Sequence, residues 1–156
     1  QNEILGGSGR QSILMEEVRE KRGLTYGVGS FLVDKRHADL YLGTVVSGND
    51  RVAEAIDVIR AEWARLAEEG LTQEVLDEAK TYITGAYPLR FDGNGRIADI
   101  LVGMQFNDLP ADYIATRNDR INAVTLDEIN RVAAELLQPE ALHFVVVGQP
   151  EGLSDS

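Results

Sequence analysis

The sequence has 156 residues, of which 44% are hydrophobic and 26% charged, a length and composition that predict one globular domain with a single core. Its formal net charge of −11 argues against nucleic acid as a partner, because phosphate binding requires a basic patch. The absence of cysteine excludes disulfides and thiolate metal sites, and no apolar run reaches the roughly 20 residues of a membrane span.

The first residues read as the tail of a helix that stops at Gly6-Gly7. The beginning of this helix is absent, so we expect the sequence to be a fragment of a longer polypeptide. Any targeting segment would then lie outside it. A second helix is predicted to start at Ser12, whose hydroxyl suits an N-cap, and to end at Gly23, whose missing Cβ suits a left-handed stop.

The end of this second helix carries candidate functional residues. Three cations crowd its last turn, where they suit the carbonyl end of the helix dipole: Arg19, Lys21 and Arg22. Beyond Gly23, residues alternate with the period of two that is typical of a strand. A guanidinium, Arg19, and a phenol, Tyr26, are thus expected on two rigid elements joined by a sharp corner. From the residues alone, a plain helix-to-strand corner with helix-end charges is the favoured interpretation.

The rest of the chain predicts a hairpin and then a run of helices. Alternating runs at 24–33 and 38–46 flank the polar turn 34–37, which favours two antiparallel strands. Helices are expected over about 50–69, 73–87, 97–107, 113–124 and 126–137. Gly70 ends the first of these helices and Thr72 caps the second, while Thr125 and Glu128 form a capping box.

A buried strand is expected to close the chain at Leu142 to Val147. Together these elements predict the α+β class, with helices packed on one face of a mostly antiparallel sheet. Strands that precede the fragment would complete this sheet. The segment 1–156 is expected to form one domain.

Several residues that could carry chemistry are better explained by structure. Trp63 falls on the apolar stripe of its helix, so we expect it in the core rather than in a binding site. The only two histidines, His37 and His143, are too far apart for the H-x-x-E-H motif of a zinc site. The acidic run at 74–78 is expected to be a solvated helix face. The sequence therefore predicts no metal site on this chain.

Three stretches resemble the insulinase/pitrilysin zinc metallopeptidases: Asn2-Glu3-Ile4-Leu5-Gly6-Gly7, Ser12-Ile13-Leu14-Met15, and Arg19 to Tyr26. They are similar to the N-I-L-G-G turn, the S-R-L helix start and the R-E-K-x-G-L-x-Y corner of the second, non-zinc half in the bacterial and mitochondrial-processing-peptidase-like branch. The similarity extends to the Val145-Val146-Val147-Gly148 run and so covers nearly the whole chain. Ile13 departs from the arginine that the family usually has there.

The resemblance implies a metallopeptidase half-domain of the LuxS/processing-peptidase-like fold, the C-terminal, inactive and non-zinc-binding domain of a longer protein. In that family two halves close around a peptide, and one of them holds the zinc. The other half supplies an Arg/Tyr substrate-binding pair, which maps here to Arg19 and Tyr26. The chain is then expected to bind peptide, to need a zinc-binding half as partner subunit or upstream domain, and to have no activity alone.

Two other functions stay open on the sequence. A structural scaffold subunit derived from the same peptidase family would have no need to keep the pair, and an independent peptide-binding module would expose it in a monomer. The presence of Arg19 and Tyr26 at the family spacing favours the catalytic partner. The resemblance suggests the bacterial periplasm as the compartment, with the cytoplasm or the mitochondrial matrix as alternatives.

Overall fold

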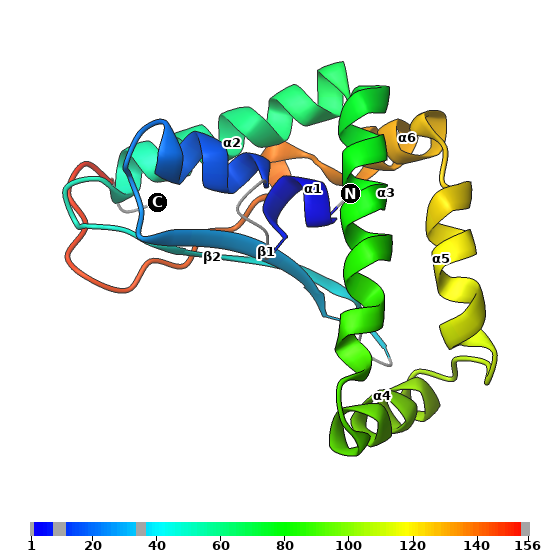
Figure 1. The fold of residues 1–156 in the computed structure, drawn as a ribbon. Coiled ribbons are helices and arrows are strands. Elements are labelled where there is room, and N and C mark those ends of the chain that lie inside the picture. The colour runs from blue at the N-terminus through cyan, green and yellow to red at the C-terminus, as the bar shows by residue number, and fades with distance from the viewer. Residues whose placement is uncertain (1, 8–11, 34–36, 154–156) are drawn as a thin grey trace. The chain divides into compact units, whose positions relative to one another are not determined.

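The computed structural model describes residues 2–7, 12–33 and 37–153, and it divides into two compact units. Unit 1 combines the chain up to Leu71 with the chain from Ile129 onward, and unit 2 is Thr72–Glu128. Unit 1 holds α1 (Asn2–Gly6), the π-helix η1 (Met15–Glu20), β1 (Gly27–Val33), β2 (Leu40–Val46), α2 (Val52–Glu69) and the 3-10 turn η3 (Pro139–Ala141) (Figure 1). Unit 2 holds α3 (Gln73–Ala86), the 3-10 turn η2 (Tyr87–Phe91), α4 (Asn94–Phe106) and α5 (Tyr113–Ala123), while α6 (Leu126–Leu136) runs from unit 2 into unit 1.

The sheet of unit 1 is a two-stranded antiparallel hairpin in which Gly27 of β1 lies opposite Val46 of β2. Helices α1 and η1 contact β1 from one side (Figure 1). Val28 points toward these helices and is buried, whereas Phe31 and Val46 point to the other side and are exposed. The α+β class and the two-sided hairpin are therefore confirmed. Of the predicted turn at 34–37, residues 34–36 lie outside the described residues.

The core of unit 1 gathers apolar side chains from both of its sequence segments. It contains Leu5, Leu14, Val18, Leu24, Val28, Ala55, Ile59, Trp63, Leu66, Ala133 and Leu137. Trp63 packs with its ring centroid 5.2 Å from that of Tyr41, so its predicted place in the core is confirmed. Asn130 then joins the two segments, because its side-chain amide donates to Leu71 O at 3.2 Å and its Oδ1 accepts from Leu71 N at 2.8 Å.

Helix α1 approaches the sheet too closely for any residue but glycine at its last position. A Cβ added to Gly6 would lie 2.3 Å from Ser30 Oγ and 2.8 Å from the Ser30 backbone nitrogen. Contacts this short cannot be relieved by rotating a flexible side chain, because one of the two atoms is backbone. The Gly6 position of the N-I-L-G-G stretch is thus explained by the packing of α1 on β1.

Unit 2 forms the predicted helices with the predicted caps. Thr72 Oγ1 accepts a hydrogen bond from Val75 N at 3.4 Å, which caps α3. In the capping box before α6, Thr125 N donates to Glu128 Oε2 at 2.9 Å and Glu128 N donates to Thr125 Oγ1 at 3.3 Å. Lys80 of α3 donates to the Asn122 carbonyl at the end of α5 at 3.0 Å, which ties these two helices together.

The structure corrects the prediction of a closing strand at 142–147. Leu142 packs against the core, but Val145 is 92% and Val147 95% exposed, and the segment is neither helix nor strand. A strand requires a hydrogen-bonded neighbour. Here β1 and β2 pair with each other and neither pairs with this segment. The apolar run predicted a strand from its residue types alone, and it does not determine whether another strand lies beside it.

The second helix begins at Ile13, directly after Ser12 as predicted, but two details of the predicted helix starts need correction. Ser12 does not cap the second helix: it is buried, and its hydroxyl has no hydrogen-bond partner among the described residues. Helix α2 begins at Val52 rather than at residue 50, because the chain at 48–51 makes a turn in which Arg51 N donates to Gly48 O at 3.0 Å.

Candidate functional site at the end of the second helix

Arg19 lies in η1, where the helix is wider than the predicted α-helix. Lys21 N donates to Glu16 O, five residues back, at 2.9 Å, which is the hydrogen bond of a π-helix. Such turns are rare and occur frequently at functional sites. The wider turn also changes which side chains are neighbours, because residue i now meets residue i+5 as well as residue i+4.

Glu17 uses this geometry to bind two of the three cations at the helix end. Its Oε1 accepts from Lys21 Nζ and its Oε2 from Arg22 Nη1, each at 2.6 Å. These two hydrogen bonds, that from Lys21 first, lower the pKa of the Glu17 carboxyl below its ordinary value. The hydrogen bond from Lys21 to Glu17, followed by the one to Glu16, raises the pKa of Lys21.

Among the residues that the structure describes, Arg19 has no such hydrogen-bonded carboxylate partner. Its ion pair among the described residues is with Glu20, and the 3.9 Å between Arg19 Nη1 and Glu20 Oε1 is too long for a hydrogen bond. The Arg19 side chain is 38% exposed. Its guanidinium therefore retains directed N–H donors that a ligand with carbonyl or carboxylate oxygens could accept.

Replacing Glu17 by Gln should lower the free energy of unfolding by less than about 1 kcal/mol at neutral pH, because exposed ion pairs contribute little. The pKa of the Glu17 carboxyl is lowered on folding, so its contribution is present above the unfolded-state pKa and is lost as pH falls through the folded-state pKa. Urea unfolding of both proteins between pH 7 and pH 3 should therefore show the difference shrink as the pH falls below the ordinary pKa of 4.5. A constant difference across this range would contradict the ion-pair explanation.

The segment 23–26, which we call the Tyr26 loop, is fastened directly to the helix that carries Arg19. Gly23 adopts a φ of +62°, which confirms the predicted left-handed stop. Gly23 N donates to Arg19 O and Leu24 N donates to Val18 O, both at 2.9 Å. The Leu24 side chain is buried in the core. The position of the loop relative to the helix end is thus fixed by backbone bonds and packing.

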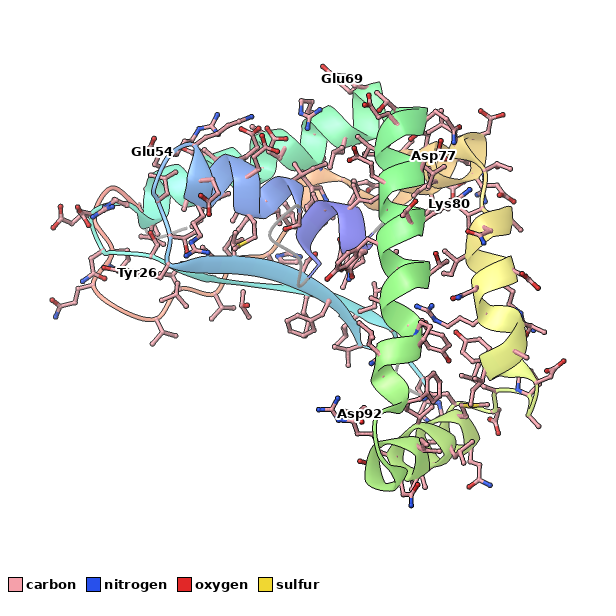
Figure 2. All side chains as sticks on the ribbon, in the orientation of Figure 1. Tyr26, Glu54, Glu69, Asp77, Lys80 and Asp92 are labelled. Atoms are coloured by element: carbon pink, nitrogen blue, oxygen red, sulfur yellow. The ribbon has the colours of Figure 1, made fainter. Side chains whose placement is uncertain are left out.

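Tyr26 itself points into solvent, with 83% of its surface exposed. The alternation in the sequence predicted a strand from Leu24 onward, which would have put Leu24, Tyr26 and Val28 on one face. Strand β1 instead begins at Gly27, and Tyr26 lies in a bend just before it (Figure 2). Leu24 and Val28 are buried while the ring between them is turned outward.

Both residues predicted for the site are therefore accessible, and they lie at the two ends of one short, hydrogen-bonded segment. A guanidinium and a phenol can each donate hydrogen bonds to oxygen acceptors. Reasoning from the sequence missed the side chains that hold this segment, namely Thr25, Ser47 and Arg51. The Thr-x-Gly spacing of Thr25 and Gly27 is the one local signal, since a threonine hydroxyl often bonds backbone two residues on.

The described residues do not fit a metal site. Within these ranges no group of three or more His, Cys, Asp or Glu side chains is placed to hold an ion. His37 and His143 are both exposed. A search of the same residues for a helix with the length and apolarity of a membrane crossing finds none.

The family model of the peptidase M16 inactive domain matches residues 2–83. This match covers more than half of the chain and includes η1, the Tyr26 loop, the hairpin and α2. The chain belongs to the peptidase M16 inactive-domain family. The resemblance seen in the sequence is thereby confirmed.

Relatives of this M16 inactive domain are considerably longer. A Helicobacter pylori protein named non-peptidase homolog YmxG is 30% identical over 147 residues, which are 92% of this chain and 33% of that protein. A Streptomyces coelicolor protein named uncharacterized zinc protease SCO5738 is 33% identical over 144 residues, 87% of this chain and 29% of that one. The crystal structure of a peptidase M16 inactive domain from Pseudomonas fluorescens matches with a TM-score of 0.77 and 29% identity, over 88% of this chain and 33% of that chain. This M16 inactive domain thus spans about a third of the length of the relatives it matches.

Proposed function

We propose that this M16 inactive domain is the C-terminal, non-zinc half of a longer peptidase, and that it binds the peptide substrate with Arg19 and Tyr26. In this proposal the pair faces the zinc site of a partner half, which is a separate subunit or an upstream domain. The observation that supports it best is the pairing at the helix end. Glu17 engages Lys21 and Arg22 and leaves the Arg19 guanidinium for a ligand.

The two side chains have different tasks in this proposal. The guanidinium of Arg19 is permanently charged and rich in donors, so it suits the carbonyl oxygens of a peptide near the cleavage point. The phenol of Tyr26 donates a hydrogen bond to the oxyanion that forms at the scissile carbonyl. Both interactions are weak while water competes, and they strengthen when a partner half covers them. The residues that the structure describes do not fit a zinc site, so in this proposal the metal and its chemistry belong to the partner half.

A structural scaffold is the second candidate function. One relative is named a non-peptidase homolog and another an uncharacterized zinc protease, so the names of these two relatives differ on peptidase activity. In a scaffold, Arg19 is only a helix-end cation and Tyr26 only an exposed ring. The two proposals differ in what removal of the Arg19 guanidinium does to catalysis.

Replacing Arg19 by Ala in the full polypeptide, or in the assembled pair of halves, should lower kcat/KM for peptide hydrolysis roughly tenfold or more. Hydrogen bonds from charged groups contribute about 1.5–3 kcal/mol, and about 1.4 kcal/mol corresponds to a factor of ten. Arg19→Lys should restore little, because an ammonium lacks the planar fork. The measurement is hydrolysis of an unstructured peptide, with thermal melting run alongside.

Arg22→Ala is the matched control, because it removes a guanidinium three residues away that Glu17 already occupies. We expect it to lose up to about 1 kcal/mol of stability while hydrolysis stays unchanged. Size-exclusion chromatography checks that each variant still assembles with the zinc-binding half. Equal hydrolysis by the wild type, Arg19→Ala and Arg19→Lys would reject the substrate role of Arg19 and favour the scaffold.

A further inference from the structure

Side-chain hydrogen bonds hold the Tyr26 loop at three consecutive positions, residues 23, 24 and 25. Thr25 is buried, and its Oγ1 lies 2.5 Å from Val46 O and 2.8 Å from Gly27 O. The same oxygen accepts a hydrogen bond from Gly27 N at 3.0 Å. The single hydroxyl of Thr25 thus links the residue before Tyr26, the residue after it and the end of β2.

The other two contacts come from the connection between β2 and α2. Ser47 Oγ donates to Leu24 O at 2.5 Å, and Arg51 Nη1 donates to Gly23 O at 2.9 Å. Arg51 thus holds residue 23, Ser47 holds residue 24, and the Thr25 hydroxyl holds residue 25.

The ring of Tyr26 cannot be held by packing, since 83% of its surface is exposed. Its placement therefore depends on the backbone that carries it. Val46 O is the key acceptor there, because it receives both Tyr26 N at 3.0 Å and the Thr25 hydroxyl. Removing that hydroxyl would leave Tyr26 attached to β2 through one backbone bond, with the peptide units on both sides of it freer to rotate.

We propose that Thr25, assisted by Ser47, is a positioning residue that aims the Tyr26 phenol at the reacting carbonyl. This inference rests on the proposed function, in which the phenol stabilises an oxyanion. Hydrogen bonds to a developing charge act only over a narrow range of distance, and a misplacement of about 1 Å can cost 10²-fold in rate. The Tyr26 loop supplies the rigidity that such a donor needs before substrate arrives.

The test is a double-mutant cycle in the assembled peptidase. Thr25→Val, which is nearly isosteric, should lower kcat about tenfold with little change in KM, because the phenol acts in the transition state rather than in substrate binding. Thr25→Ser keeps the hydroxyl and should restore most of the rate. In a Tyr26→Phe background, Thr25→Val should cost nothing further, because no phenolic hydroxyl remains to be positioned.

Each outcome of the cycle decides the inference. An equal loss in both backgrounds would show that Thr25 acts on general stability, and no loss in the wild-type background would show that it has no role; either overturns the proposal. Full activity of Tyr26→Phe by itself would instead reject the proposed function of the phenol. Should Thr25→Val fail to fold, Ser47→Ala takes its place in the same cycle, with the same non-additivity expected.

Discussion

Tyr26→Phe should lower kcat for peptide hydrolysis by the assembled enzyme roughly 10²-fold, the usual cost of removing one oxyanion donor. The change deletes a single hydroxyl from a ring that is 83% exposed, so it removes no packing from the folded chain. The melting temperature and the assembly with the zinc-binding half should therefore stay as in the wild type. Steady-state hydrolysis of an unstructured peptide, at saturating and at low substrate, separates the expected loss in kcat from any change in KM.

Tyr82→Phe provides the control for this experiment, because Tyr82 is also exposed but belongs to α3 in unit 2. Its hydrolysis rate should match that of the wild type. A Tyr26→Phe enzyme that retains full activity would show that the phenol has no transition-state role. The scaffold would then be the better account of this M16 inactive domain.

Trp63→Ala should produce the largest loss of stability, about 3–5 kcal/mol, because truncation of a buried aromatic leaves a cavity in the core. Trp63 is 8% exposed and packs against the ring of Tyr41. Urea unfolding followed by far-ultraviolet circular dichroism measures the change. Trp63 is the only tryptophan of the chain, so in the wild type its fluorescence reports the unfolding of unit 1 independently.

Phe106→Ala is the aromatic control, because Phe106 is 84% exposed at the end of α4. Its effect on the free energy of unfolding should stay within about 0.5 kcal/mol, as for most surface substitutions. A loss below about 1 kcal/mol for Trp63→Ala would contradict its role in the core and reopen the question of a binding aromatic.

Most of the helices could be predicted because their signals are local. The stop at Gly23, the cap at Thr72 and the box of Thr125 and Glu128 each depend on residues within a few positions, and all three are present in the structure. The closing strand could not be predicted in the same way. A strand is a relation between two segments, and the apolar run at 142–147 says nothing about its neighbour.

The candidate site shows the same difference between local signals and contacts with distant residues. Arg19 and Tyr26 came from a resemblance in spacing, whereas their local structure depends on contacts that spacing does not encode. The π-helix cannot be read from six residues, because a turn of either width keeps Leu14 and Val18 on one buried face. The hydrogen bond from Thr25, just before β1, goes to Val46, 21 positions away in the sequence.

The bond between Asn130 and Leu71 has a consequence for how the chain is made. These residues lie 59 positions apart, and the whole of unit 2 is synthesised between them. Unit 2 is continuous in the sequence, whereas the core of unit 1 is incomplete until Ala133 and Leu137 have been synthesised. Leu5 and Leu66, which line one cavity with Ala133 and Leu137, therefore lack these neighbours until the C-terminal segment of unit 1 is synthesised.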